Sequence, residues 1–275
     1  LWGVDRRYLD DSNFVEKRQL ELRRDQWDFD IDEMAARYGD QDYRVFNLAV
    51  NTFNDSKPSA FHNQVGGYSA AKLSRYQNLI DFYISRHINM DVLNMLNTRY
   101  IVVQNGQVQR NPEALGNAWF VHDVKWVDDA NGEIMALNDF DPATTAVLNR
   151  NEVTLSDTES AIDSTNVIVM EHQQTYNPDY LKYTTHTSDE QLAVFSEIYY
   201  KPDWRAYIDG KPAEYFRANY VLRAMLVPAG DHVIEFKNEA PRMHRLDNIT
   251  LVISIITLLL MAGAVVLVYR KKSKE

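Results

Sequence analysis

The sequence contains no cysteine among its 275 residues. This absence excludes a disulfide framework, a thiolate nucleophile and a zinc site with cysteine ligands. A P-loop and a G-x-S-x-G elbow are also missing, and the seven histidines lack the i, i+4 or H-x-H spacing of metal sites. We therefore expect no catalytic residue, no metal and no cofactor within this chain.

Positive charge is scarce, since 29 lysines and arginines oppose 39 aspartates and glutamates for a net charge of -10. Binding to phosphate backbones needs a basic surface, so we expect no nucleic-acid partner. Hydrophobic residues make up 45% of the chain and aromatic residues 12%, which is enough for two domains with cores of their own.

One long stretch carries no charge, the 21 residues of 249–269. At a rise of about 1.5 Å per residue, a helix of this length crosses a hydrocarbon layer of about 30 Å. The tail 270–275 follows it with four cations, which are Arg270, Lys271, Lys272 and Lys274. Because basic tails stay in the cytoplasm, we expect a transmembrane helix in the lipid bilayer, a cytoplasmic C-terminus and exocytoplasmic soluble domains.

Targeting signals are absent as well. No LPxTG-like motif precedes the apolar stretch, and the first 17 residues, which begin with Leu1, show no signal-peptide pattern. We interpret the chain as a fragment whose missing N-terminal membrane helices belong to the same protein. Residues 249–269 would then be the last span of a multi-pass protein.

The pattern of residues 1–143 predicts a mixed α+β exocytoplasmic domain. Asp30 is expected to cap a short helix that ends at Gly39, and the amphipathic spacing of residues 69–97 predicts a helix that breaks near Asn89. Between extended arms, Asn105-Gly106 predicts a two-residue hairpin turn.

Residues 144–245 show recurring short extended runs with turn residues such as Asp209-Gly210 between them. This spacing predicts an antiparallel β-sandwich close to the membrane surface. The expected fold class is therefore α+β, with a mixed N-terminal domain, a sandwich domain and one C-terminal transmembrane helix.

Two D-x-D patterns, Asp28-Phe-Asp30 and Asp139-Phe-Asp141, resemble the metal-binding motif of some sugar-nucleotide transferases. They lack a nucleotide-binding βαβ context, so helix capping and turns explain them better.

Two groups of residues are candidates for contact with a glycan or another acceptor. Gly66, Gly67 and Tyr68 precede a predicted helix, where backbone N–H groups could meet an anion or a sugar hydroxyl; the alternative is a tight loop. In the sandwich, aromatic residues could form a platform for a sugar ring, although they are more often core residues, and Arg223 is expected to pair with an acid across the sheet. This second group contains Trp204, Tyr207, Tyr215, Tyr220 and Arg223.

The order of several segments resembles the C-terminal region of the YfhO family of bacterial multi-pass membrane proteins. The segments are LNMLNTRYIVV, NPEALGNAWFV, and YYKPDWRAYIDGKPAEYFRANYVLRAMLVPAGDHVIEF, followed by the apolar stretch. HNQVGGYSAAKLSRYQ and DYRVFNL also fit the pattern, whereas Asp203 departs from the glycine that the family commonly has there.

The resemblance implies a membrane glycosyltransferase that uses a polyprenyl-phosphate sugar to modify a lipoteichoic-acid-like glycopolymer at the bacterial cytoplasmic membrane. In that architecture the catalytic carboxylate lies in an early loop outside this chain, so this part would be accessory. Two alternatives stay open. One is a non-catalytic carbohydrate-binding or structural envelope module, and the other is a hydrolase, which would need a pocket with acids about 5 to 10 Å apart.

Overall fold

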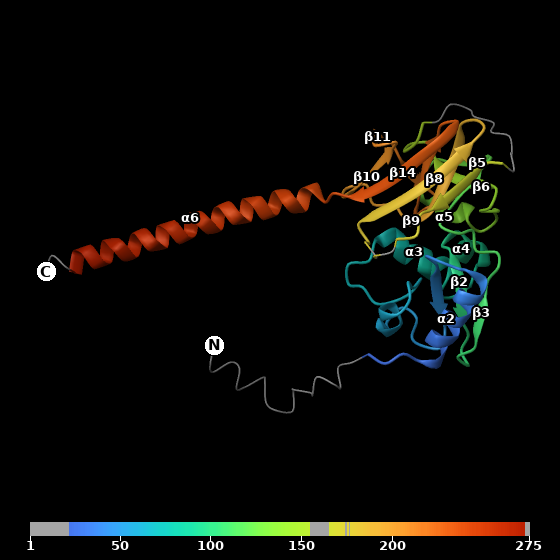
Figure 1. Ribbon diagram of the computed structural model, residues 1–275, viewed down its shortest axis with the longest axis horizontal. Coiled ribbons are helices and arrows are strands. Elements are labelled where there is room, and N and C mark those ends of the chain that lie inside the picture. The colour runs from blue at the N-terminus through green and yellow to red at the C-terminus, as the bar shows by residue number, and fades with distance from the viewer. Residues whose placement is uncertain (1–21, 155–164, 174, 176, 273–275) are drawn as a thin grey trace.

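The computed structural model describes residues 22–154, 165–173, 175 and 177–272. Within them the chain is a mixed α/β protein with a sandwich of two antiparallel sheets, a layer of short helices, a small N-terminal sheet and one long C-terminal helix (Figure 1). Predictions for residues 1–21 and for tail residues 273–275 lie outside the described residues.

The first sheet of the sandwich has the strand order β11-β10-β14-β8-β7, and the second has the order β12-β13-β9-β4. Between them lies an aromatic core in which Tyr183, Phe195 and Phe236 meet edge to face, with the Phe195 ring centroid 4.9 Å from that of Tyr183 and 5.0 Å from that of Phe236. The strands are β4 (Ala118–Val121), β7 (Val167–Met170), β8 (Tyr180–Thr187), β9 (Gln191–Ile198), β10 (Trp204–Ile208), β11 (Lys211–Ala213), β12 (Phe216–Ala218), β13 (Leu222–Val227) and β14 (Gly230–Asn238). The predicted antiparallel sandwich arrangement is confirmed, although β4 lies outside the predicted range 144–245.

The four-stranded sheet is buried on both faces. Along β9, Ala193 and Phe195 point into the sandwich, whereas Leu192 and Val194 point the other way, into a second core. That second core is covered by α3 (Ser74–Tyr83), α4 (Met90–Met95), α5 (Ala130–Ala136) and the parallel pair β5 (Asp123–Val127) and β6 (Thr145–Asn149).

The N-terminal part contains α2 (Gln26–Tyr38), η3 (Lys57–Ala60) and a sheet of β1 (Arg44–Asn47), β2 (Thr98–Val102) and β3 (Val108–Arg110). Ile31 of α2 packs on Val45, Tyr100 and Val102 of this sheet. Two strand pairings cross the predicted boundary between residues 143 and 144, because β4 pairs with β9 and β5 pairs with β6. The boundary itself stays a prediction.

Most local predictions are right, with informative exceptions. The stretch 69–97 is interrupted near Asn89, as expected, although α3 begins only at Ser74; the Asn89 side chain caps α4. Helix α2 ends at Gly39 with φ 70°, also as expected. The prediction that Asp30 caps this helix is wrong, because α2 already begins after Asp25. The backbone N–H of Asp25 donates to the Asp28 carboxylate at 2.8 Å. The β2–β3 hairpin has a longer loop than predicted, because only Gly106 takes a positive φ there.

Helix α6 (Pro241–Lys272) leaves the sandwich and projects away from it (Figure 1). Its stretch Arg245–Ala264 is long and apolar enough to cross a membrane, and none of that stretch is buried against the rest of the described chain. The helix therefore exposes a continuous apolar surface, as the sequence predicts for a membrane span.

Candidate functional site

A pocket of about 330 Å³ lies at the first turn of α3. Its walls come from α3, from the end of β9 and the chain after it, and from β12 and the turn before β13, so α3 meets segments more than 100 residues away in the sequence. The lining residues of this α3 pocket are Leu73, Ser74, Arg75, Tyr76, Ile198, Tyr199, Tyr200, Lys201, Pro202, Arg217, Tyr220 and Val221. Three cations and several tyrosines thus share one hollow.

Arg75 is the centre of one half of the α3 pocket. Its guanidinium pairs with Glu133 of α5, donates to the carbonyl of Tyr220 at 3.2 Å, and has its carbon 4.8 Å from the Tyr220 ring centroid. An arginine in this position combines an ion pair with a stacked aromatic face, which fixes the plane of the guanidinium.

Arg217 forms the other half in the same way. It donates to both carboxylate oxygens of Glu152, at 2.9 and 2.8 Å, and lies 4.8 Å from the Tyr199 ring centroid. Glu152 also lies 3.5 Å from Arg75, so one carboxylate bridges the two guanidinium groups. The two arginine and tyrosine stacks therefore form one connected network.

Asn219 positions Tyr220 in the α3 pocket. Both residues have a positive φ, 48° and 70°, in the turn between β12 and β13. The backbone N–H of Asn219 donates to the carbonyl of Val147 at 3.0 Å, and its side-chain oxygen accepts from the N–H of Val147 at 2.8 Å. The buried asparagine docks the turn onto β6, which sets Tyr220 over Arg75.

Glu133 lies beneath the network and is fully buried. Burial raises the pKa of this carboxyl, against the opposing effect of Arg75, and its Oε1 atom has no hydrogen-bond partner among the described residues. A carboxyl sealed in this way cannot reach a substrate. The α3 pocket therefore has the groups to bind a polar ligand, with cations, hydroxyls and aromatic faces, rather than a pair of groups for acid and base catalysis.

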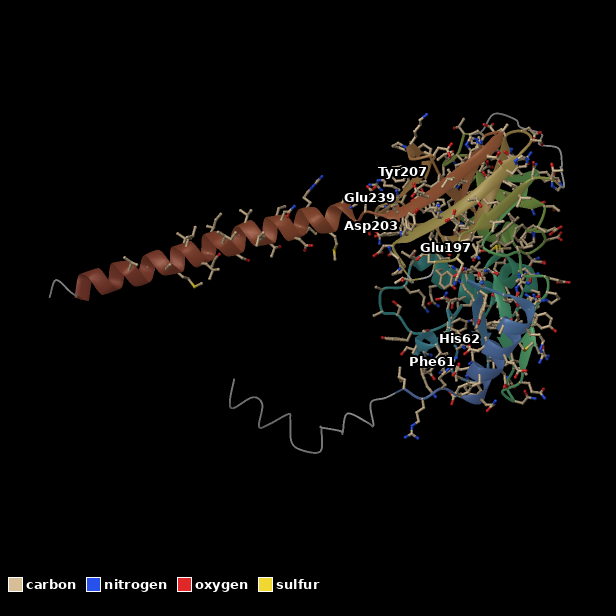
Figure 2. The ribbon with its side chains drawn as sticks, viewed as in Figure 1. Phe61, His62, Glu197, Asp203, Tyr207 and Glu239 are labelled. Carbon is tan, nitrogen blue, oxygen red and sulfur yellow. The ribbon has the colours of Figure 1, made fainter. Side chains whose placement is uncertain are left out.

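The α3 pocket lies near the base of the long helix. Lys201 and Pro202 in its wall precede Asp203, whose carbonyl accepts from the N–H groups of Glu239 and Ala240 at 2.9 and 3.3 Å. Pro241 then begins α6, so Asp203 and Glu239 mark the point where the helix leaves the sandwich (Figure 2). Helix α3 and the loop before it lie on the same side of the molecule (Figure 1).

The predicted glycines form a tight loop beside this pocket. The N–H of Gly67 donates to the carbonyl of Thr52 at 2.6 Å, and a Cβ atom on Gly66 would collide with that same carbonyl oxygen. The Gly67 N–H is therefore occupied within the protein. Tyr68, by contrast, is 64% exposed.

The predicted aromatic residues of the sandwich do not share one surface. Trp204 and Tyr215 pack in the sandwich core, Tyr207 on the other face of β10 donates its hydroxyl to Glu239, and Tyr220 lies in the α3 pocket. Among the described residues Arg223 forms no ion pair with an acid; it is buried with its guanidinium over Trp204. Of these residues, only Tyr220 lines the α3 pocket.

The network around Tyr220 depends on four residues that the sequence did not identify. They are Arg75, Glu133, Glu152 and Arg217. Arginine and glutamate are usually surface residues, so nothing in the neighbouring sequence marked these four. Helix α5, which carries Glu133, was also not predicted. The one available signal was that Arg75 lies within the stretch 69–97 that the sequence predicts as helical; in the structure it lies in the first turn of α3.

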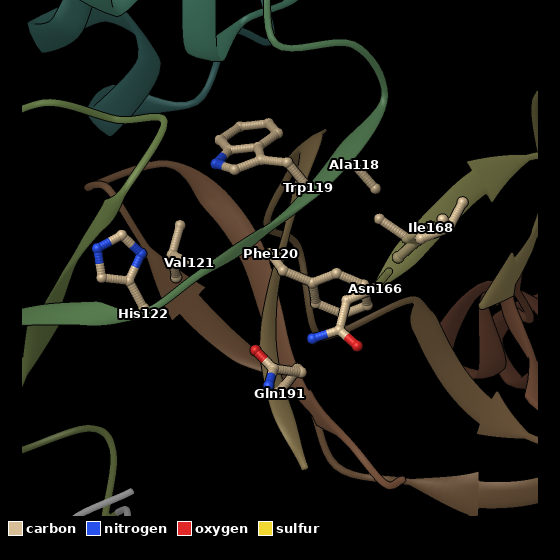
Figure 3. Close-up of a pocket in the computed structure, with 9 residues that line it drawn as sticks. Ala118, Trp119, Phe120, Val121, His122, Asn166, Ile168 and Gln191 are labelled. Atoms are coloured by element: carbon tan, nitrogen blue, oxygen red, sulfur yellow. The ribbon is translucent and has the colours of Figure 1, made fainter. Parts of the chain in front are cut away.

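Another hollow, of about 350 Å³, lies between the edge strands β4 and β7 (Figure 3). Its lining is mainly apolar, with Trp119, Phe120, Val121 and Ile168, and His122 is its one titratable side chain among the described residues. In the part of the chain that the structure describes, no group of three or more histidines and acids could hold a metal ion.

Comparisons with protein-family models, with curated proteins and with solved structures give no match for this chain. Its membership in the YfhO family is therefore a proposal that rests on the order of the sequence segments alone.

Proposed function

We propose that this chain is the accessory, non-catalytic part of a bacterial membrane glycosyltransferase-like protein of the YfhO type. In this proposal α6 is the last membrane span, the sandwich and its helical layer are exocytoplasmic, and the α3 pocket holds a phosphate-bearing glycopolymer acceptor. The sugar donor would be a polyprenyl-phosphate sugar, and the reacting carboxylate would lie in the membrane part of the protein.

One observation carries the proposal, the position of the α3 pocket beside the base of α6. The candidate span Arg245–Ala264 begins four residues after Pro241, or about 6 Å along the helix, and its uncharged apolar part begins at Ile249. If α6 spans a bilayer, the α3 pocket lies close to the membrane surface. A polymer anchored in that surface is then within reach of Arg75, Lys201 and Arg217.

The chemistry of the α3 pocket supports a polymer that carries both phosphates and hydroxyls. Lys201 pairs with Glu214, whose side chain is 88% exposed, and its ammonium lies 5.9 Å from the Tyr215 ring centroid. Tyr200 is 40% exposed. An exposed ion pair contributes little to stability, so the Lys201 ammonium can exchange its partner for a phosphate at small cost. Tyr200 supplies a ring and a hydroxyl for the sugar or glycerol units.

The binding test uses the whole chain in phosphatidylcholine nanodiscs with poly(glycerol phosphate) lipoteichoic acid as the probe. Lys201→Ala and Tyr200→Ala should each weaken binding several-fold, and added salt should weaken binding of the unsubstituted chain. Lys211→Ala is the matched control, because it removes another exposed lysine, from the edge strand β11 outside the α3 pocket. No saturable binding, or equal loss with Lys211→Ala, would contradict the α3 pocket as the acceptor site.

The link to a transferase needs a test in cells. In a bacterium that encodes the whole protein, deletion of residues 22–245 should abolish glycosylation of the envelope polymer while the membrane part is still inserted. Normal glycosylation after that deletion would contradict the proposed accessory role. Polymer binding without any effect on glycosylation would favour the second candidate, a carbohydrate-binding envelope module, which the tyrosines and cations of the α3 pocket also suit.

A further inference from the structure

A second cavity, of about 280 Å³, lies where the N-terminal layer meets the sandwich. It is lined by polar side chains from five separate segments, which are Asp42 and Arg44, Asn63 and Gln64, Asn117, the group His172, Gln173 and Asn177, and Glu197. Glu197 marks its place at the junction (Figure 2). We call it the Asp42 cavity, and none of its residues belongs to the α3 pocket.

A single buried side chain holds two walls of the Asp42 cavity together. The Asn97 amide donates to the carbonyl of Asp42 and to Oδ1 of Asn117, both at 2.9 Å, and the Asn97 side chain is almost completely buried. Because both partners share one donor group, their relative position is fixed before any ligand arrives. Such preorganisation is typical of binding sites rather than of open surface.

Arg44 holds Glu197 in place in the wall of the Asp42 cavity. Its Nη1 atom donates to the carbonyls of Leu96 and Ser196, at 2.9 and 2.7 Å, and its Nη2 atom donates to Oε1 of Glu197 at 3.0 Å. These contacts use the donors of Arg44 on the protein itself. The guanidinium therefore acts as a clamp for Glu197 and not as a free anion receptor.

Groups of both signs of charge line the Asp42 cavity. Asp42 lies 2.9 Å from Nδ1 of His172, and Glu197 is paired with Arg44. An anion would meet two carboxylates, and a cation would meet the Arg44 guanidinium. The electrostatics therefore favour an uncharged ligand.

Several polar groups nevertheless lack a partner within the described part of the chain. They include the second oxygens of Asp42 and Glu197, the Nδ2 group of Asn117 and the side-chain amides of Asn63 and Gln64. These are acceptors and donors side by side. A sugar hydroxyl is itself a donor and an acceptor, so a polyhydroxylated ring satisfies such a mixed set. Met170 and Leu181 supply an apolar wall for the C–H face of the ring.

We infer that the Asp42 cavity binds one uncharged pyranose ring through Asp42, Gln64, Asn117 and Glu197. The inference stands on this cavity alone, so it holds whether or not the α3 pocket binds a polymer. The two carboxylates are held in place as hydrogen-bond acceptors, Asp42 by its contact with His172 and Glu197 by Arg44, so we assign the Asp42 cavity to binding and not to hydrolysis.

Met170 provides a direct readout without any substitution. The whole chain, with ¹³C-labelled methionine methyl groups in detergent micelles, is titrated with glucose, galactose and N-acetylglucosamine. At least one sugar should shift the Met170 methyl resonance saturably at millimolar concentration. Met225, buried in the sandwich core, should not respond. If none of the three sugars shifts Met170, or if inorganic phosphate shifts it instead, the inference is wrong.

Two substitutions then test the assigned side chains. Asp42→Asn keeps the shape at a residue with φ 51°, a backbone conformation that asparagine tolerates, and Gln64→Ala removes an amide while its backbone bridge to Val45 stays possible. Each should raise the apparent dissociation constant at least fivefold. Asp231→Asn, near the start of β14 and outside the Asp42 cavity, is the matched control and should leave the Met170 response unchanged. Lys201→Ala in the α3 pocket should also leave it unchanged. Unaltered sugar affinity in both cavity variants would overturn the inference.

Discussion

The guanidinium carbon of Arg223 lies 4.1 Å from the ring centroid of Trp204 and 5.1 Å from that of Phe236. The side chain is 2% exposed, its Nε atom donates to the carbonyl of Ile198 at 3.2 Å, and its Nη1 atom has no partner among the described residues. Burial lowers the pKa of Arg223. Aromatic rings thus hold this cation inside the sandwich without a hydrogen-bonded carboxylate.

This arrangement predicts different outcomes for two substitutions. Arg223→Met should keep the free energy of unfolding within about 1 kcal/mol, because an apolar chain of similar length replaces a charge that is costly to bury. Arg223→Lys should lower it by about 1 to 3 kcal/mol, since an ammonium is more strongly hydrated and cannot stack on the indole. Thermal unfolding followed by circular dichroism measures both, and the opposite order of stability would contradict the account.

His232 predicts a pH-dependent contribution to stability. Its Nδ1 atom lies 2.7 Å from Asp209, and this hydrogen bond raises the pKa of His232 above its ordinary value of about 6.5. A raised histidine pKa stabilises the fold fully below pH 6.5, and the contribution is lost as the pH rises through the folded-state pKa. The stability lost in His232→Gln should therefore be larger at pH 5.5 than at pH 8.5.

The Asp209→Asn background provides the control for this effect. Without the carboxylate, His232→Gln should change the free energy of unfolding almost equally at both pH values. A pH-dependent difference of the original size in that background would mean that Asp209 is not the cause.

Strands on the two sides of residue 143 pair with each other, which predicts that the first half of the chain does not fold alone. A chain that ends at residue 143 leaves β4 without β9 and β5 without β6, which exposes Trp119 and Val121. We expect no cooperative unfolding transition from this piece. A chain that ends at residue 238 keeps every described strand and should unfold cooperatively; a cooperative transition in the shorter piece would show that the predicted domain is independent.

The absence of cysteine makes the proposed topology directly testable. Single cysteines at the exposed Ser56 and at tail residue Ser273 give two labelling sites in an otherwise thiol-free chain. In intact cells, a membrane-impermeant maleimide should label Ser56→Cys and not Ser273→Cys, and both should react after the membrane is permeabilised. Labelling of the tail in intact cells would reverse the proposed orientation.

Local chemistry explains why several elements were predictable. Gly39 and Asn89 act through backbone φ and capping hydrogen bonds within a few residues, and the alternation along β8 and β14 reflects contacts with the next strand. Helix α5 escaped prediction because ANGEIMA is short and contains a glycine, and its helix is stabilised mainly by packing of Ile134 in the second core.

The two proposed binding sites were less predictable, because their residues are far apart in the sequence and meet only in the folded chain. Tyr220 was a candidate from its type alone, but its neighbour Arg75 lies 145 residues away in the sequence. Asp42 and Glu197 reach one cavity only because Asn97 and Arg44 tie distant segments together. Short-range patterns carry no information about such contacts.

The sequence by itself determined the apolar helix, the lack of thiol chemistry and the strand-rich second half, because composition and periodicity act locally along the chain. Tertiary structure decided that β4 joins the sandwich, that Arg223 stacks on Trp204 and does not pair with an acid, and that polar residues gather in two separate cavities. These outcomes depend on which surfaces meet when the chain closes on itself, and that choice is made by the packing of the whole core.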